Sequence, residues 1–588
     1  MCGICGQFNF NRRSADKDLV RKMAYLIRHR GPDDEGFYFE GNLGLGHRRL
    51  NIIDLKTGHQ PMSNEDQTVW IVANNEIYNF IELREELQAK GHSFRTNSDT
   101  EVIIHLYEEL QERCVEKLIG MFAFAIWDRR KKRLFLARDR FGIKPLHYFY
   151  DKNCFLFASE IKALLEYRNI DKTLNPLAID QYFRLLYIVE PNTIFKKIHK
   201  LAPAHYLICN GKDVYVKKYW DADFLTSRKF NEEYYIENLR NRLNQSIKLT
   251  LRSDVPVGVF LSGGVDSSSV AGLAGKFNTK VKTFSVIFKE KMFSEEKFSR
   301  LMADKFSFDH HELIITADDA FKAIPKVASM LDEPFADSSC IPTYYVSKLA
   351  RNHVKTVLTG EGGDELFAGY PWHTDRIAGK KNLNFLLNSP KRAIFNDSML
   401  KQLYSHNFMQ QAGFKSTKNT NIDINKLRKL NNLNKLLYVD LKVYLPSDML
   451  VKMDRMSMFN SLEARLPLLN HDFAEFVLAI PSNLKISKGI RKYILKKSLR
   501  NLLPASIINR EKMGFSIPMD IWLWRKGKFS DMIYDVLFDQ RTKKRGYFDF
   551  AAVKKMFYEH DHLICLHGHR IWALFMFELW HRNFLDKN

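Results

Sequence analysis

The stretch VPVGVFLSGGVDSSSVAGLAG (residues 255–275) changes character within a few residues. Its apolar start predicts a buried strand, Ser-Gly-Gly predicts a tight turn, and the small residues that follow predict a helix. Two further apolar runs, VKTFSVIF (281–288) and VKTVLT (354–359), also predict strands. Strands that alternate with helices predict a parallel α/β sheet, which binds ligands at the carboxyl ends of its strands.

The turn in SGGVDSS (262–268) has the composition of a phosphate loop. Its backbone N–H groups can close on a phosphate, and the helix N-terminus that follows adds a favourable dipole. Asp266 would repel phosphate unless a cation lies between them, so the loop predicts Mg²⁺ as well as a nucleotide. The GK[ST] of a Walker A loop is missing.

A second acidic glycine turn, GEGGDE (360–365), follows the strand predicted at 354–359. Asp364 can supply a second oxygen ligand for Mg²⁺, and Glu361 can take a proton or orient an acceptor. Either acid alone is equally typical of a solvated surface. Two such turns, each after a strand, favour a site.

The first two hundred residues have a different pattern of apolar and polar residues. Short apolar runs in LGLGHRRLNIID, TVWIVANNEIYN, GMFAFAIWD and KRLFLARDR predict strands. SDTEVIIHLYEEL (98–110) predicts a helix with Ser98 as its N-cap and Glu101 completing a capping box. This half is therefore expected to be β-rich with a few helices.

The composition of the chain limits the classes of protein to which it can belong. The 588 residues are too many for one core, and 45% hydrophobic with 27% charged residues is a soluble globular balance. No apolar run approaches the roughly 20 residues of a membrane span, and the N-terminus lacks an apolar signal region. Seven scattered cysteines argue against a disulfide framework. We therefore expect a cytoplasmic protein without a membrane span.

The net charge of +22 has several possible meanings, among them nucleic acid, an anionic membrane surface and acidic substrates. A chain-wide lysine bias is the favoured interpretation, because lysine is spread over the whole sequence. No RNP1-like motif, zinc-finger spacing or dense basic arm is present, so no nucleic-acid partner is expected.

Several motifs, in order, carry a resemblance to a known family. SGGVDSS looks like the pyrophosphate loop of ATP pyrophosphatases. With LDEPFADSS (331–339), TGEGGDELFAGY (359–370) and SLEARLPLLN (461–470), it resembles the synthetase domain of the glutamine-hydrolysing asparagine synthetase family. Five earlier strings resemble that family's class II glutamine amidotransferase domain: RHRGPD (28–33), GHRRLNIID (46–54), NNEIYN (74–79), SDTEV (98–102) and RDRFGIKPL (138–146).

The resemblance implies the domain organisation. Residues 2–205 would form a four-layer αββα sandwich, and residues 206–530 a parallel-sheet α/β synthetase domain that binds ATP. Residues 531–588 would form a helical C-terminal extension. Glutamine, aspartate and ATP are the implied substrates, Mg²⁺ is the implied metal, and a homodimer is a family-based expectation.

Cys2 and Cys5 admit two interpretations, since their C-x-x-C spacing is also that of a redox pair or half a zinc site. In the family that this chain resembles, a Cys exposed by removal of Met is the nucleophile. A free α-amine titrates near pH 8, so it can take the thiol proton and later protonate leaving ammonia. The zinc interpretation needs a second ligand pair, and none stands out. Cys5 is then expected to be a buried apolar residue.

The resemblance also implies a glutamine pocket. Arg49 would hold the α-carboxylate, while Glu76 and Asp99 would hold the α-ammonium group. Asn74 and the backbone N–H of Asn75 would form the oxyanion hole. The family pattern has glycine where this chain has Asn75, and Asn tolerates left-handed backbone better than most residues. Ile53 completes the implied glutamine-binding set.

In the synthetase domain, the resemblance implies a larger set of roles. Glu361 would act as base or acceptor-orienting acid, and Lys512 would neutralise charge on the intermediate and pyrophosphate. Asp266 and Asp364 would hold Mg²⁺. The residues implied to bind ATP or pyrophosphate are Phe260, Ser262, Gly263, Gly264, Asp266, Ser267, Val286, Thr359 and Gly360.

The expected function is glutamine-dependent asparagine synthesis. The family pattern VPFLD reads LPLLN here, with Asn470 replacing Asp, so an alternative is a same-scaffold amidotransferase that acts on a cell-wall or surface-polysaccharide carboxylate. A more remote alternative is a non-enzymatic basic binding protein, which would make both acidic glycine turns and Cys2 accidental.

Overall fold

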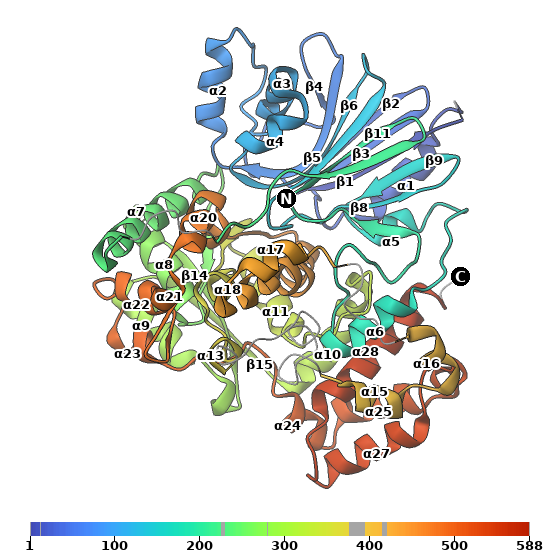
Figure 1. Ribbon diagram of the computed structural model, residues 1–588, viewed down its shortest axis with the longest axis vertical. Helices are drawn as coiled ribbons and strands as arrows, with labels where there is room; N and C mark the ends of the chain where they lie inside the picture. The colour runs from blue at the N-terminus through green and yellow to red at the C-terminus, as the bar shows by residue number, and fades with distance from the viewer. Residues whose placement is uncertain are drawn as a thin grey trace.

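The computed structural model describes residues 2–11, 13–224, 230–278, 280–375, 394–413 and 420–586. Two bodies are visible in Figure 1, with the N-terminal sheets above a largely helical C-terminal part. In the described part, no helix is both long enough and apolar enough to cross a membrane. All seven cysteines are described and none is in a disulfide.

The N-terminal domain contains two six-stranded sheets whose neighbouring strands are antiparallel. The first has the order β10-β8-β9-β1-β3-β2, and the second β12-β11-β7-β6-β5-β4. The strands of the first sheet are β1 (Gly3–Asn9), β2 (Asp34–Glu40), β3 (Leu43–Arg49), β8 (His147–Tyr150), β9 (Cys154–Ala158) and β10 (Ile198–Lys200). Those of the second are β4 (Met62–Ser63), β5 (Val69–Ile77), β6 (Gly120–Asp128), β7 (Arg133–Arg138), β11 (His205–Asn210) and β12 (Asp213–Lys218).

The alternation of side chains between the two faces of β6 explains how the sheets and helices form layers. Phe122, Phe124 and Ile126 pack with helices on one side of the sheet, whereas Ala123 and Ala125 pack between the two sheets. Successive side chains of a strand point to opposite faces, so a strand apolar at every position is buried on both. The predicted αββα sandwich is confirmed.

Helices cover both outer faces of the sandwich. They are α1 (Lys17–Leu26) and α5 (Ile161–Leu164) on the first sheet, and α2 (Phe80–Ala89), α3 (Glu101–Leu110) and α4 (Cys114–Lys117) on the second. Cys5 is buried in the core beside α1, as expected of a small apolar residue.

The helix predicted at 98–110 is present as α3, but its predicted cap is wrong. Thr100 is the N-cap residue and makes no side-chain cap bond. Glu101 instead accepts hydrogen bonds from the backbone N–H groups of Arg95 and Thr96, both at 2.8 Å. Because Arg95 and Thr96 lie only six and five residues before Glu101, a competing local contact replaces the capping box.

The C-terminal domain is built on a parallel sheet with the order β15-β14-β13-β16-β17. Its strands are β13 (Val257–Phe260), β14 (Lys282–Phe288), β15 (Asp309–Ile315), β16 (Thr356–Leu358) and β17 (Glu463–Arg465). The predicted parallel α/β class is therefore confirmed. The sequence did not predict β17, whose three residues are too short to give a strand pattern.

Helices surround this sheet and form most of the remaining chain (Figure 1). Those before β17 are α6 (Pro176–Leu185), α7 (Glu232–Thr250), α8 (Val265–Phe277), α9 (Glu296–Phe306), α10 (Ala317–Met330), α11 (Cys340–Arg351), α12 (Gly363–Phe367), α13 (Pro371–Asp375), α15 (Asp397–Leu403), α16 (His406–Ala412), α17 (Ile424–Lys429), α18 (Asn432–Val439) and α19 (Leu450–Phe459). Those after it are α20 (His471–Ala479), α21 (Ser482–Lys485), α22 (Tyr493–Ser498), α23 (Ala505–Asn509), α24 (Met519–Trp524), α25 (Lys528–Phe538), α26 (Gln540–Lys544), α27 (Phe550–Asp561) and α28 (Gly568–Phe584).

Two structural features bear on the predicted domain limits at 205 and 530. β11 begins at His205 and pairs with β7, and β12 continues that sheet to Lys218. At the other end, α28 is integrated into the fold: Tyr182 OH donates to the carbonyl of Ala573 at 2.7 Å, and Trp580 Nε1 to that of Asp332 at 2.8 Å.

Candidate active sites

Cys2 lies directly before β1 and is buried. Its backbone nitrogen donates to Asn74 Oδ1 at 3.0 Å, and its carbonyl accepts from Arg30 Nε at 3.1 Å. Burial raises the pKa of the Cys2 thiol, while the Leu50 backbone N–H and the Arg49 charge act in the opposite direction. The residue is thus held at both its nitrogen and its carbonyl.

Asn74 sits beside Cys2 on β5 with one polar atom unused. Its Oδ1 accepts from the Cys2 nitrogen, but its Nδ2 is buried and makes no hydrogen bond. A buried donor without a partner is costly and calls for an explanation. Such a donor suits the predicted oxyanion hole, where an amide oxygen would accept from it.

Asn75 occupies an extended position in β5, paired with Phe122, and not a left-handed one. Its Nδ2 donates to Asp99 Oδ2 at 2.7 Å, and its Oδ1 accepts from Thr100 Oγ1 at 3.1 Å. Tolerance of left-handed backbone is therefore not what accommodates Asn at this position. The side chain instead ties the strand to the loop before α3.

Arg49, the last residue of β3, is oriented by a loop. Its Nη2 donates to the carbonyls of Ile53 at 3.2 Å and Asp54 at 2.6 Å. Gly58 packs against the same guanidinium, since a Cβ there would lie 2.1 Å from Arg49 Nη2. Ile53, predicted to bind glutamine, thus also contacts Arg49 through its backbone carbonyl, and this contact orients the guanidinium.

Asp99 and Glu76, the two acids predicted to bind the glutamine ammonium group, are both buried but have different partners. Burial raises the pKa of Asp99 to about 6, although its carboxylate accepts from the Ile77 backbone N–H at 2.8 Å. Glu76 Oε2 pairs with Arg465 Nη2 at 2.9 Å, while Glu76 Oε1 has no hydrogen-bond partner. Arg465 belongs to β17 of the other domain, so sequence reasoning missed this contact.

The phosphate loop between β13 and α8 has the predicted strand–turn–helix form. Gly263 has φ +72°, and a Cβ there would lie 2.5 Å from Phe298 Cβ, so only glycine fits. Ser262 Oγ and Ser267 Oγ lie 3.0 Å apart, and the Gly264 backbone N–H donates to Ser262 Oγ at 3.3 Å.

Asp266 and Asp364 converge on one ammonium group. Lys492 Nζ pairs with both carboxylates, at 2.7 Å from Asp364 Oδ1, and Lys512 Nζ pairs with Asp364. Burial raises the pKa of Asp266 against the charge of Lys492; at Asp364 the two lysines outweigh burial and lower the pKa. The glycines of the second turn permit this approach, because a Cβ on Gly363 would lie 2.5 Å from Asp266 Cγ.

Glu361 faces the same region from the second turn. Its Oε2 is buried without a hydrogen bond, and burial raises its pKa against the Thr359 hydroxyl and the Lys452 charge. Lys452, on α19, pairs with Asp337 Oδ2 at 2.9 Å and donates to Ser339 Oγ at 2.7 Å. The LDEPFADSS and GEGGDE motifs therefore meet at Lys452, which the sequence did not single out.

Three residues of the predicted nucleotide set lie on neighbouring strands of the sheet or just beyond them. Phe260 ends β13, Val286 lies in β14 next to it, and Gly360 follows β16 on the other side. The position of Gly360 is tight, since a Cβ there would lie 2.8 Å from the Ser267 nitrogen. Thr359 connects this edge to β17 through its backbone N–H, which donates to the Arg465 carbonyl at 2.9 Å.

Asn470, the departure from the family pattern, is a helix cap. It is buried, and its Oδ1 accepts from the Asp472 backbone N–H at 3.1 Å at the start of α20. An Asp carboxylate caps a helix equally well. The structure thus gives Asn470 a local role as a helix cap.

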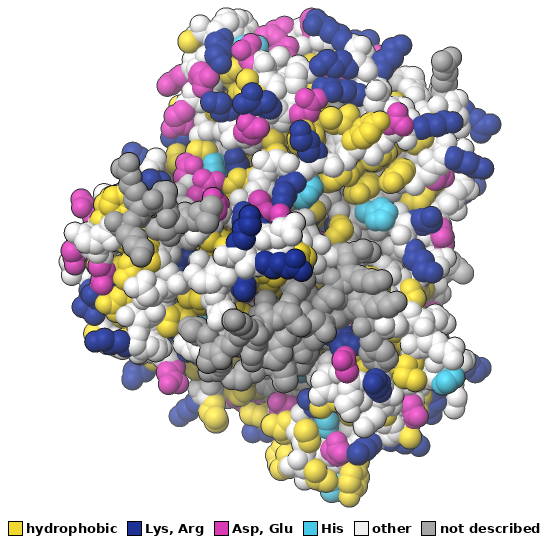
Figure 2. All heavy atoms as spheres, in the orientation of Figure 1, with side chains coloured by type: hydrophobic (Ala, Val, Ile, Leu, Met, Phe, Trp, Pro, Cys, Tyr) yellow, Lys and Arg dark blue, Asp and Glu magenta, His cyan; other side chains and the backbone are white. Residues whose placement is uncertain are grey.

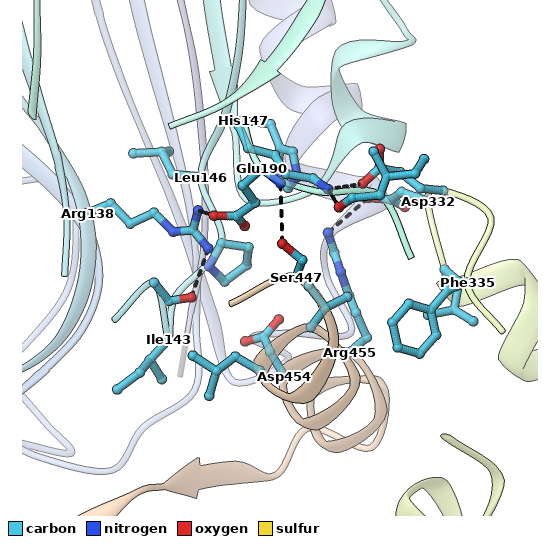
Figure 3. A pocket seen from close by; sticks show the side chains of 18 of the residues that line it. Arg138, Ile143, Leu146, His147, Glu190, Asp332, Phe335, Ser447, Asp454 and Arg455 are labelled. Carbon is cyan, nitrogen blue, oxygen red and sulfur yellow. Dashed lines mark hydrogen bonds and ion pairs between the residues drawn. The ribbon is translucent and has the colours of Figure 1, made fainter. Parts of the chain in front are cut away.

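Two adjoining cavities lie between the domains. The smaller is lined by Ile143, Lys144, Leu450, Met453, Asp454, Ala464 and Leu466. The larger shares Ile143, Leu450 and Asp454 with it and holds buried ion pairs (Figure 3). Among them, Arg138 Nη1 lies 3.0 Å from Glu190 Oε2, and Arg455 Nη2 lies 3.3 Å from Asp332 Oδ2.

Arg30 joins the nucleophile to the second domain. While Nε donates to the Cys2 carbonyl, Nη1 and Nη2 donate to the two carboxylate oxygens of Asp454 on α19, both at 2.8 Å. The guanidinium is fully buried, and its fork matches the carboxylate in the bidentate manner typical of strong pairs. The RHRGPD motif gave the position of Arg30, but no sequence signal identified Asp454 as its partner.

Comparison with known proteins follows the same division of the chain. A family model described as "Glutamine amidotransferase domain" matches residues 1–220, and one described as "Asparagine synthase" matches residues 238–582. The second match includes most of the predicted C-terminal extension.

Similar proteins match most or all of the chain. Asparagine synthetase (glutamine-hydrolyzing) 1 of Bacillus subtilis is 34% identical over 624 residues, covering 100% of this chain and 97% of that protein. Asparagine synthetase (glutamine-hydrolyzing) 3 of the same organism is 33% identical over 544 residues, covering 88% and 87%. Amidase chyE of Penicillium rubens is 28% identical over 657 residues, covering 95% and 96%.

Proposed function

Because the chain belongs to the asparagine synthase family, we propose that it is a glutamine-dependent asparagine synthetase, an ATP-dependent ligase with two coupled sites. The family implies the use of ATP. Glutamine would supply nitrogen at Cys2, and aspartate would accept it at the phosphate loop. All three proposed substrates are small molecules.

At the first site, removal of Met1 would convert the Cys2 nitrogen into a free α-amine held by Asn74 Oδ1. This amine would take the thiol proton as sulfur attacks the glutamine amide carbon. Asn74 Nδ2 and the Asn75 backbone N–H would stabilise the oxyanion. Ammonia leaves with the proton returned by the amine, and water hydrolyses the thioester to glutamate.

At the second site, the aspartate side-chain carboxylate would attack the α-phosphorus of ATP, releasing pyrophosphate to the loop of Ser262, Gly263, Gly264 and Ser267. Ammonia would then attack the acyl-adenylate carbonyl and displace AMP, giving asparagine. Glu361 would accept the proton that ammonia loses, since its buried Oε2 makes no hydrogen bond. Lys512 would neutralise charge on the pyrophosphate.

Asp266 and Asp364 would hold Mg²⁺. The fit is supported by their shared Lys492 contact, which places both carboxylates within reach of one cation, and by Asp266 Oδ1, which is buried without a hydrogen bond. Hard cations of this kind prefer carboxylate oxygen. The ion would supply positive charge to the phosphates of ATP.

The smaller interdomain cavity would carry ammonia between the sites. Most of its lining is apolar and comes from both domains, namely Ile143 on one side and Leu450, Met453, Ala464 and Leu466 on the other. Ammonia is a nucleophile only when unprotonated, and a water-poor passage would keep it so. This route lies within one chain and does not require a homodimer.

The observation that best supports coupling is the contact of β17 with the glutamine pocket. Arg465 pairs with Glu76 across the domain interface, and its carbonyl accepts from Thr359 beside the second glycine turn. One strand therefore touches both sites.

A product assay tests the proposal. Purified protein is supplied with glutamine, ATP, Mg²⁺ and aspartate, and products are detected by mass, with Cys2→Ala as control. We expect equal amounts of asparagine and AMP, lost in the control with glutamine but retained with ammonium. Glutamate without asparagine would instead mean that another carboxylate is the acceptor.

A further inference from the structure

Two histidines and a carboxylate meet on the outer helical layer of the N-terminal domain, away from the residues assigned above. His92 follows α2, while His105 and Glu108 lie three residues apart on one face of α3. In the described part of the chain, they form the one group of three or more His, Cys, Asp and Glu residues whose ligand atoms all approach within 4.8 Å.

The distances within this cluster suit a divalent ion. Glu108 Oε2 lies 2.9 Å from His105 Nδ1 and 3.7 Å from His92 Nδ1. Metal–ligand bonds of about 2.0–2.2 Å in a tetrahedral arrangement place ligand atoms roughly 3.3 Å apart. The other carboxylate oxygen, Oε1, accepts from Asn64 Nδ2 at 2.7 Å, which leaves Oε2 directed at the histidines.

The far nitrogen of each ring provides a second, independent observation. His92 Nε2 lies 3.1 Å from Glu109 Oε1. His105 is about 1% exposed; its Nε2 makes no hydrogen bond and lies 3.9 Å from Glu101 Oε1. A carboxylate hydrogen-bonded to the second ring nitrogen fixes and strengthens histidine ligands in metal sites, and Glu109 has this position behind His92.

Glu101 is itself fixed in place. It accepts from the backbone N–H groups of Arg95 and Thr96 at 2.8 Å each, and from Thr96 Oγ1 at 2.6 Å. Glu101 and Glu108 therefore flank His105 on two sides, and their negative charge favours a cation between these groups.

We propose that His92, His105 and Glu108 bind one zinc-class divalent cation, with a water in the fourth position. Imidazole and carboxylate ligands in a tetrahedral set suit Zn²⁺ or Co²⁺ rather than Mg²⁺, which prefers six oxygens. The ion would tie the segment after α2 to α3, whose preceding residues Asp99 and Thr100 hold Asn75. The proposal does not depend on the asparagine synthetase assignment.

The test uses Co²⁺ and Zn²⁺ on the untagged full chain carrying Cys2→Ala, so that the nucleophilic thiol cannot bind the ion, with Mg²⁺ in excess. Titration calorimetry and the visible absorption of bound Co²⁺ report stoichiometry and geometry. His92→Ala and Glu108→Gln remove ligands at partly exposed positions, and far-UV circular dichroism checks that each variant is folded. His562→Ala, an exposed histidine near the C-terminus, is the matched control.

We expect one bound equivalent with a tetrahedral Co²⁺ spectrum. Affinity should fall by more than about tenfold in both ligand variants, since even loss of an outer carboxylate costs about that much, and should be unchanged in the control. Absence of a bound equivalent, or unchanged affinity in either folded ligand variant, would overturn the site.

Discussion

Arg465 Nη2 lies 2.9 Å from Glu76 Oε2, with both side chains buried at the boundary between the domains. The same guanidinium donates through Nε to Glu463 at 2.6 Å and through Nη1 to the carbonyl of Thr250 at 2.9 Å. A residue of the synthetase sheet thus neutralises an acid of the predicted glutamine pocket.

Replacing Arg465 tests that contact. Arg465→Met leaves the buried Glu76 carboxylate without its partner, and breaking a buried pair costs about 3–5 kcal/mol of unfolding free energy. Burial already raises the pKa of Glu76 well above its usual value against the charge of Arg465. Loss of that charge would raise the pKa further and weaken the hold on the glutamine ammonium group, so KM for glutamine should rise. Urea denaturation and glutaminase kinetics measure the two effects.

The matched control is Arg252→Met. Arg252 also crosses the interface, to Glu82 at 2.6 Å, but this pair is substantially exposed. Exposed pairs contribute about 0–1 kcal/mol. Equal losses of unfolding free energy in the two variants would show that the buried Arg465–Glu76 pair stabilises the fold no more than the exposed pair does.

Asn74→Ala should separate the two activities. It removes the buried Nδ2 donor, and loss of one oxyanion donor lowers kcat by about 10²–10³-fold. Ammonium-dependent asparagine formation should be unchanged, since that reaction bypasses Cys2. Asn79→Ala, in the same NNEIYN motif but bonded to Lys117 and Ile119, should retain glutaminase rate. A full glutaminase rate in Asn74→Ala would refute its oxyanion role.

Lys492→Met should impair synthesis and spare glutamine hydrolysis, which is the reverse of the effect expected for Asn74→Ala. Without this ammonium, the carboxylates of Asp266 and Asp364 would lose one of the positive charges that offset their repulsion of the ATP phosphates, and we expect ammonium-dependent synthesis to fall by about 10²-fold or more. Glutamine hydrolysis without ATP should persist. Lys497→Met, which loses a partly exposed pair with Glu232 and a contact with the Tyr493 ring, should behave as wild type. If both lysine variants retain synthesis, Lys492 is not part of the nucleotide site.

Asp99 predicts a pH dependence of glutamine binding. Its pKa is raised to about 6, and only the ionised carboxylate would hold the glutamine ammonium group. Glutaminase kcat/KM should therefore decrease about tenfold per pH unit below pH 6. Because a carboxyl pKa raised by folding means that the folded state keeps its proton longer, this group lowers stability as pH rises from about 4 to about 6.

Asp99→Asn provides the comparison for that profile. The variant cannot ionise at this position, so its kcat/KM should be low at every pH and lack the inflection near pH 6. An unchanged inflection would assign the titration to another group.

Much of the fold could be predicted from sequence. Alternating strands and helices around the phosphate loop, and short apolar runs in the N-terminal half, gave both fold classes, which are confirmed together with the family. Buried strands such as β6 are apolar on both faces, and glycine turns follow strands directly. These signals are local, so a single sequence contains them.

Contacts between distant segments could not be predicted. Arg465, Asp454, Lys452 and Lys492 take part in buried ion pairs, yet each is an ordinary charged residue in its local stretch. The capping box at Ser98 failed for a different, local reason, because the Glu101 carboxylate accepts from Arg95 and Thr96 in the preceding loop. Among 90 basic and 68 acidic residues, only the tertiary structure distinguishes these few. On the face shown in Figure 2, Lys and Arg side chains are dispersed over both bodies.

The most direct test of coupling follows nitrogen. The enzyme is given glutamine labelled with ¹⁵N in its amide, together with ATP, Mg²⁺, aspartate and excess unlabelled ammonium near neutral pH, and the asparagine is analysed by mass. If ammonia travels inside the protein, asparagine will carry far more ¹⁵N than the bulk ammonium pool. Label diluted to the composition of that pool would contradict an internal passage between Cys2 and the phosphate loop.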